Sequence, residues 1–142
     1  MKRIFAICPL LLILVLTGCS DNIAVSGKVT FSDDNTPLTV GMVFFETETF
    51  QARGVLDSEG RYQLGSRELT DGLPAGQYRV YIGGALVEDP RIRSGEGPPL
   101  PLLESQYESG TTSGLTADVD KSNKKFDFSV GRNMQTAQQL KK

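Results

Sequence analysis

The sequence predicts an all-β fold, a sandwich of seven short strands that follows an N-terminal leader. Apolar and polar residues alternate with a period of two in short stretches, which is typical of strands that bury one face. Turn residues separate these stretches at intervals of roughly 8–12 residues, the spacing of sandwich proteins. The 142 residues include 15 Gly and 7 Pro, which suits a turn-rich β domain, and the length suits one domain.

Residues 1–18 are predicted to be a signal peptide. Met1 is followed by Lys2 and Arg3, and then by an apolar run over residues 4–16. As a helix rising about 1.5 Å per residue, this run is too short to cross about 30 Å of hydrocarbon. Pro9 also interrupts it, so we expect a cleaved leader and not a membrane helix.

The end of this leader, Leu16-Thr17-Gly18-Cys19, resembles the lipobox of bacterial lipoproteins, in which an aliphatic and two small residues precede a cysteine. The resemblance implies that the Cys19 thiol receives a diacylglyceryl group with fatty acyl chains such as palmitate. Each buried CH₂ group contributes about 0.8 kcal/mol, so two or three chains hold a protein to a membrane. The alternative is that Cys19 is an ordinary residue near a signal cleavage site.

Lipidation also decides the state of the cysteines and the charge of the mature chain. Cys8 leaves with the leader and Cys19 is acylated, so we expect no free thiol and no disulfide. Loss of Lys2 and Arg3 leaves 13 of the 15 basic residues against 17 acidic ones, a formal charge of −4. This charge argues against nucleic acid as a partner, and we expect membrane attachment to come from the lipid.

Residues 19–22 are expected to be the lipidated cysteine and a very short tether. In many lipoproteins of Gram-negative cells, Asp directly after the cysteine favours retention in the inner membrane. Here Ser20 follows Cys19 and Asp21 comes next. We therefore expect a lipid-anchored protein of the cell envelope, with the outer membrane mildly favoured.

The mature domain begins with a predicted strand over residues 23–31, in which Val25, Val29 and Phe31 share one face. The second predicted strand, residues 39–47, is apolar on both faces, which indicates a central position in its sheet. Residues 51–57 and 61–64 are predicted to pair as a hairpin across the turn that ends at Gly60.

The next predicted strand, residues 77–83, shows the clearest alternation. Tyr78, Val80 and Ile82 are expected to face the core, whereas Arg79 and Tyr81 face the solvent. Shorter alternating stretches predict the last two strands, at residues 115–119 and 126–130.

Residues 85–113 interrupt this spacing and include four prolines. We expect a long loop without regular structure, either a crossover between the two sheets or a segment that contacts a ligand or partner. The polar residues 131–142 are expected to form a frayed tail or a short marginal helix.

Four motifs, in the same order, resemble the carboxypeptidase regulatory-like domains. The motifs are Val25-Ser26-Gly27-Lys28-Val29 with Thr36-Pro37-Leu38, Asp57-Ser58-Glu59-Gly60-Arg61-Tyr62, Leu73-Pro74-Ala75-Gly76-Gln77-Tyr78, and residues 112–119 with Phe126-Asp127-Phe128. The resemblance covers residues 23–130. It implies a seven-stranded Greek-key sandwich of the prealbumin (transthyretin-like) or Ig-like type, a kind of domain that is non-catalytic in larger proteins.

No catalytic or metal centre is predicted. The chain has no His, which excludes a Ser-His-Asp triad and an imidazole metal site. The acidic turns at residues 33–35 and 57–59 carry the oxygens that Ca²⁺ prefers, but Asp and Asn in turns bond their own backbone. We therefore predict no metal and no cofactor.

The candidate ligand surface is the outward pair Arg79 and Tyr81, a stacking surface for a sugar or peptide; the alternative is a solvated sheet face. Together these observations predict a membrane-anchored, non-catalytic lipoprotein that is a binding or structural module at the cell envelope. Its expected partners are the membrane, through the acylated cysteine, and a protein or carbohydrate. The alternatives are a soluble exported carrier or enzyme, and a partner-binding subunit of an envelope complex that uses a sheet edge.

Overall fold

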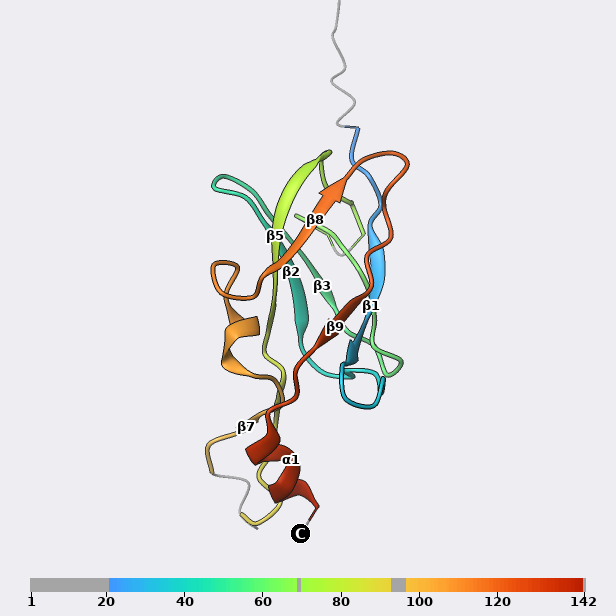
Figure 1. The fold of residues 1–142 in the computed structure, drawn as a ribbon. Coiled ribbons are helices and arrows are strands. Elements are labelled where there is room, and N and C mark those ends of the chain that lie inside the picture. Colours follow the sequence, from blue (N-terminus) through green and yellow to red (C-terminus); the bar gives the residue numbers. More distant parts are fainter. Residues whose placement is uncertain (1–20, 69, 93–96, 142) are drawn as a thin grey trace, which may run out of the picture.

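The computed structural model describes residues 21–68, 70–92 and 97–141 (Figure 1). Within them lie a four-stranded sheet in the order β3-β2-β5-β8, a three-stranded sheet in the order β4-β1-β9, and a small sheet, β6-β7. The two larger sheets share one core, which confirms the predicted all-β sandwich, whereas its Greek-key connection remains a prediction. The strands are β1 (Ser26–Phe31), β2 (Met42–Glu46), β3 (Gln51–Val55), β4 (Arg61–Gln63), β5 (Gly76–Gly83), β6 (Leu86–Val87), β7 (Leu100–Pro101), β8 (Leu115–Val119) and β9 (Phe128–Val130).

The core follows the alternation of the strands, and Phe45 of β2 lies at its centre. Its ring is fully buried, and four aromatic rings surround it with centroid separations between 5.9 and 6.3 Å. Burying a side chain of this size contributes about 2–3 kcal/mol. β2 pairs with β3 on one side and β5 on the other, so the predicted central position of this strand is confirmed. The four rings belong to Tyr62, Tyr78, Phe126 and Phe128.

The first and last strands of the sandwich lie side by side. β1 pairs with β9 in parallel, and Val29 is opposite Phe128. Just before β9, the carbonyl of Phe126 comes so close to Gly27 that a Cβ on this glycine would lie 1.7 Å from the oxygen. The buried Tyr62 hydroxyl donates a hydrogen bond to the same carbonyl at 2.6 Å. Gly27 is therefore required by a close backbone approach.

The predicted hairpin between residues 51–57 and 61–64 forms only in part, with backbone hydrogen bonds between Asp57 and Arg61 and between Arg53 and Gly65. The turn itself forms, because Gly60 has a φ of 73° and the Asp57 carboxylate accepts the backbone N–H groups of Glu59 and Arg61. After the turn, however, β4 pairs with β1 in the opposite sheet, and β3 pairs with β2. The chain changes sheets here because both layers need a buried face, and an isolated bridge joins Arg53 of β3 to Gly65, just after β4.

The long loop predicted for residues 85–113 contains regular structure, so its description as structureless is wrong. β6 and β7 pair through Leu86 and Pro101, and the 3-10 helix η1 (Ser105–Glu108) follows. Ala85 and Leu103 are buried in the sandwich core. Such short strands cannot be predicted from the sequence, because two residues are too few to show an alternation of apolar and polar side chains.

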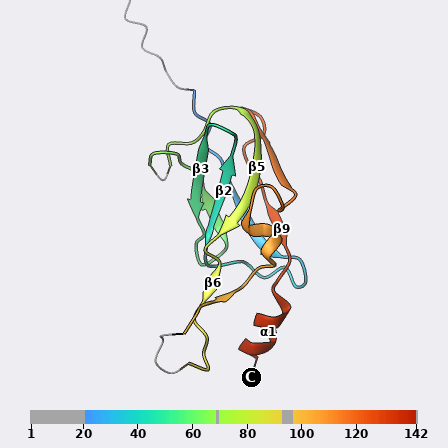
Figure 2. The ribbon, with the colours of Figure 1, turned by 90° about the vertical axis from the view of Figure 1, so that its left-hand side faces the viewer.

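After β9 the chain forms a short helix, α1 (Met134–Leu140), one of the two outcomes expected for the polar tail. The Asn133 side chain caps this helix by accepting the backbone N–H groups of Gln135 and Thr136. α1 and the β6-β7 pair lie at the end of the sandwich opposite to the one where the chain enters (Figures 1 and 2). Among the residues that the structure describes, no helix is long and apolar enough to cross a membrane.

Candidate functional site

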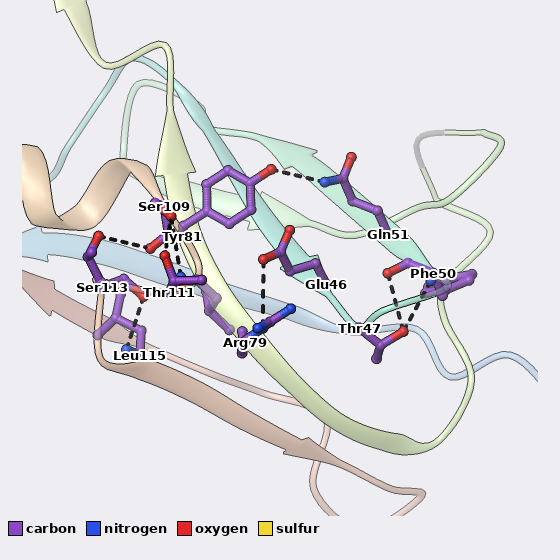
Figure 3. Close-up of polar contacts among 12 residues, drawn as sticks. Glu46, Thr47, Phe50, Gln51, Arg79, Tyr81, Ser109, Thr111, Ser113 and Leu115 are labelled. Atoms are coloured by element: carbon purple, nitrogen blue, oxygen red, sulfur yellow. Dashed lines mark hydrogen bonds and ion pairs between the residues drawn. The ribbon is translucent and has the colours of Figure 1, made fainter.

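The outer face of the four-stranded sheet carries the predicted ligand residues (Figure 3). Along β5, the side chains of Tyr78, Val80 and Ile82 are buried, whereas Arg79 is exposed and Tyr81 is partly exposed. This confirms that Arg79 and Tyr81 face outward. β2 runs antiparallel beside β5 and places its own outward side chains directly opposite them, with Glu46 against Arg79 and Phe44 against Tyr81.

Phe44 and Tyr81 form a stacked aromatic pair on this face. Their ring planes differ by 6° and their centroids are 4.7 Å apart. Gly83 makes room for the pair, because a Cβ at this position would lie 3.0 Å from the Phe44 ring. From β3, the Gln51 side-chain amide donates a hydrogen bond to the Tyr81 hydroxyl at 2.9 Å. Three strands thus fix the position of one phenol group.

Because Gln51 donates in this bond, the Tyr81 hydroxyl hydrogen is left to bond a ligand. Partial burial raises the pKa of Tyr81, and the nearby Glu46 carboxylate raises it further. The phenol is therefore protonated at neutral pH. It is a fixed hydrogen-bond donor beside an aromatic surface.

Next to this pair lies an exposed ion pair. The Arg79 guanidinium is 3.8 Å from the Glu46 carboxylate, and their side chains are 47% and 23% exposed. Gly110, in the connection between η1 and β8, packs onto both, since a Cβ there would lie 2.2 Å from the Glu46 carboxylate and 3.4 Å from the Arg79 Cβ. The connection therefore forms one wall of the site.

Ser113 attaches this wall to the sheet. Its hydroxyl donates to the carbonyl of Val80 and accepts the backbone N–H of Leu115 at 3.2 Å. Ser113 is only 8% exposed, and no base is needed to explain its contacts, so its role here is structural. Further along the wall, the hydroxyls of Ser109 and Thr111 share a hydrogen bond of 2.9 Å.

A groove of about 500 Å³ lies beyond the ion pair, toward the turn between β2 and β3. Its charged side chains are three carboxylates and one guanidinium, and hydroxyl and amide groups stand between them. This mixture of donors and acceptors, next to an aromatic pair, suits a polar ligand with several hydroxyl or amide groups. The outward side chains that line it include Glu46, Thr47, Glu48, Gln77, Arg79, Thr116 and Asp118.

The two acidic turns whose oxygens suit calcium are used within the fold. Arg132 bonds the carboxylates of Asp33 and Asp34, and Arg61 pairs with Asp57 and Glu59. Within residues 21–68, 70–92 and 97–141, no group of three or more acidic or thiol side chains is arranged to hold a metal ion.

Sequence reasoning found Arg79 and Tyr81 but missed the residues that complete their surface. Phe44 belongs to the strand that the sequence predicts to be apolar on both faces, so an apolar side chain facing outward was expected there. Gln51, Glu46 and the Ser109–Ser113 wall depend on which strands are neighbours, and this pairing has no local signal in the sequence. The other predicted site residues, Leu16, Thr17, Gly18 and Cys19, lie outside the described residues.

No model of a known protein family matches the chain, and no curated protein matches its sequence. Two crystal structures of the major pilin subunit of Bacillus cereus are similar to it, at 12% and 10% sequence identity and a TM-score of 0.46 each. Each match covers 79% of this chain and 30% of the pilin chain. A 9R-lipoxygenase from Cyanothece matches over 76% of this chain and 16% of its own, at 16% identity and a TM-score of 0.35. The chain thus spans less than a third of each of these proteins.

Proposed function

We propose that this protein is a membrane-anchored, non-catalytic β-sandwich lipoprotein that binds a polar ligand at the cell envelope. The anchor is Cys19, which carries the lipid and becomes the first residue when the leader is cleaved off after Gly18. The ligand surface is the outer face of the four-stranded sheet around Tyr81. The ligand class is a carbohydrate or a peptide.

One observation carries the binding part of this proposal. The outward side chains of β2, β3 and β5 meet in a single surface, where a stacked pair, a fixed phenol donor and an open groove adjoin. Aromatic faces pack on the apolar faces of sugars and on peptide side chains, and the polar groups around them provide orientation.

We also propose that residues 23–130 are a carboxypeptidase regulatory-like domain. The support is that residues of its motifs have structural roles in this fold. Gly27 permits the approach of the Phe126 carbonyl, and Gly60 takes the positive φ of its turn. Tyr78 places its ring in the core and donates a hydrogen bond from its hydroxyl to the Pro74 carbonyl at 2.8 Å.

We further propose delivery to the outer membrane, which Ser20 directly after Cys19 supports.

The anchor is tested in cells. Globomycin, which blocks the lipoprotein signal peptidase, is expected to leave an uncleaved precursor, and Cys19→Ala is expected to move the protein out of the membrane fraction. An unmutated protein that is already soluble, and whose distribution Cys19→Ala leaves unchanged, would favour a soluble exported carrier or enzyme.

The ligand surface is tested on the unlipidated Cys19→Ala protein by NMR titration with soluble oligosaccharides and short peptides. We expect shifted amide signals from β2, β5 and residues 109–116, and weaker binding in a Tyr81→Ser variant. Gln63→Ala, an exposed position in the other sheet, is the matched control. Shifts confined to the three-stranded sheet would refute the proposed face.

A further inference from the structure

The chain is fixed to the sandwich from the first residues that the structure describes. The Asn22 side-chain amide donates to the Asp71 carbonyl at 3.0 Å. Ile23 and Leu73 exchange backbone hydrogen bonds of 2.8 and 3.1 Å, and Ile23 is buried in the core. The Asp21 carboxylate lies 3.6 Å from the ammonium group of Lys121. Any anchor upstream of Asn22 therefore acts directly on this end of the domain.

The distance between the anchor and the domain is limited by chain length. Cys19 and Asn22 are separated by three peptide units, which span at most about 11 Å when fully extended. A bilayer has a hydrocarbon core of about 30 Å and is about 40–45 Å thick with its headgroups, so each headgroup layer is about 5–8 Å deep. A lipid chain on Cys19 thus leaves the domain only a few ångströms beyond the headgroups.

We propose that the entry end of the sandwich rests on the glycerophospholipid headgroup layer of the membrane that holds Cys19. The entry end comprises the chain at Asp21–Ile23, the β2–β3 turn, the connection before β5 and the β8–β9 turn, which lie together at the top of Figure 1. This inference rests on the proposed lipidation of Cys19.

The chemistry of the entry end suits headgroups. Lys121 and Lys124 flank the entering chain around a hollow of about 240 Å³, and the Lys121 side chain is 80% exposed. Two nearby carboxylates accept hydrogen bonds from their own loops: Asp71 accepts the backbone N–H of Ser66 at 2.5 Å, and Asp120 that of Ser122 at 2.6 Å. Lys121 shares its charge with Asp21, so Lys124 is the main cation that this end offers to lipid phosphates.

This seating orients the whole molecule. α1 and the β6-β7 pair lie at the far end and point away from the membrane (Figure 2). The groove beside Gln77 and Asp118 opens on the side of the sandwich near the entry end, because these residues pair where β5 begins and β8 ends. A ligand in the groove would therefore be held close to the membrane surface.

The experiment uses the full-length lipidated protein in vesicles of phosphatidylethanolamine and phosphatidylglycerol. Because Cys19 is acylated and Cys8 is removed with the leader, a cysteine introduced elsewhere is the only free thiol of the mature chain. Thr49→Cys carries a fluorophore at the entry end, and Ser58→Cys carries it at the opposite end; both positions are exposed. A headgroup-attached quencher is expected to quench the label at residue 49 several-fold more than the label at residue 58.

A ten-residue Gly/Ser insertion between Ser20 and Asp21 is the second variant. It adds an average reach of about 17 Å and should remove most of the difference between the two labels. Equal quenching at both positions without the insertion, or stronger quenching at residue 58, would overturn the inference. A protein that does not float with the vesicles at all would instead refute the proposed lipidation, so the two failures are distinguishable.

Discussion

The guanidinium of Arg132 lies over the ring of Phe31, with 3.7 Å between its central carbon and the ring centroid. The same guanidinium bonds the carboxylates of Asp33 and Asp34 and the hydroxyl of Thr36. Phe31 ends β1, and Arg132 lies between β9 and α1. One side chain thus joins the first turn of the domain to the start of its C-terminal helix.

Replacing Arg132 with Ala removes the cation–π contact and the ion pairs together. We expect the free energy of unfolding to fall by about 1–2 kcal/mol, because the Arg132 side chain is only 21% exposed and a partly desolvated contact of this kind contributes that much. Urea denaturation measures the change. Arg61→Ala is the control, since Arg61 is 64% exposed and its ion pairs contribute little. An equal loss in both variants would contradict the role of Arg132.

The turn bound by Arg132 predicts how stability depends on pH. Hydrogen bonds from Thr36 and the charge of Arg132 lower the pKa of Asp34 from 3.8 to about 2. A carboxylate with a lowered pKa stabilises the fold above its unfolded value and loses this effect as the pH falls through its folded value. We expect the urea midpoint to fall between pH 4 and pH 2, and Asp34→Asn to reduce this fall.

A second variant separates the causes of this shift. The Thr36 hydroxyl donates to the Asp34 carboxylate at 2.6 Å, so Thr36→Val should raise the pKa of Asp34, although it also removes one of the hydrogen bonds of Arg132. NMR titration of the Asp34 side chain measures this pKa directly. An unchanged pKa in Thr36→Val would assign the shift to the backbone N–H of residue 36 and to Arg132, and not to the hydroxyl.

Gly27→Ala is expected to destabilise the sandwich by about 3 kcal/mol or more, because overpacking against backbone cannot be relieved by a rotamer change. The added Cβ would meet the Phe126 carbonyl and the Tyr62 hydroxyl. Gly84→Ala is the matched control, because its Cβ meets nothing within 4 Å and only the φ of 69° is unfavourable, at a cost of about 1–2 kcal/mol. Thermal unfolding of both variants tests the difference. Similar melting temperatures would show that the β1–β9 junction can move apart.

The aromatic pair on the outer face is tested by a double-mutant cycle of Phe44→Leu and Tyr81→Leu. We expect a coupling energy of about 0.5–1.5 kcal/mol, the usual range for stacked aromatic pairs. Phe44→Leu combined with Gln63→Ala, in the other sheet, should be additive. Additivity of the first pair would mean that the two rings act independently and form no single surface.

How far the sequence predicts this fold depends on how local each signal is. The alternation of Tyr78, Val80 and Ile82 specifies a strand and its buried face, and the structure agrees. The turn at Gly60 was also recognisable, because a positive φ has a residue preference. The pairing of β4 with β1 was not recognisable, since Gly27 and Tyr62 are brought together only when the whole sandwich closes.

The candidate site shows the same limit. The outward direction of Arg79 and Tyr81 follows from strand periodicity alone. Their contacts with Gln51 and Gly110 depend on strand order and on the path of a proline-rich connection, and neither is encoded within a few residues. The same holds for Arg132, whose partners lie almost 100 residues earlier in the chain.

The parallel pairing of β1 with β9 also sets the order of events during synthesis. The backbone N–H of Lys28 is bonded by the Asp127 side chain, 99 residues later. One side of β1 therefore has no partner until almost the whole domain has been made, and contacts of such long range form slowly. For the exported lipoprotein that we propose, late closure is an advantage. It keeps the polypeptide unfolded until its last strand is available.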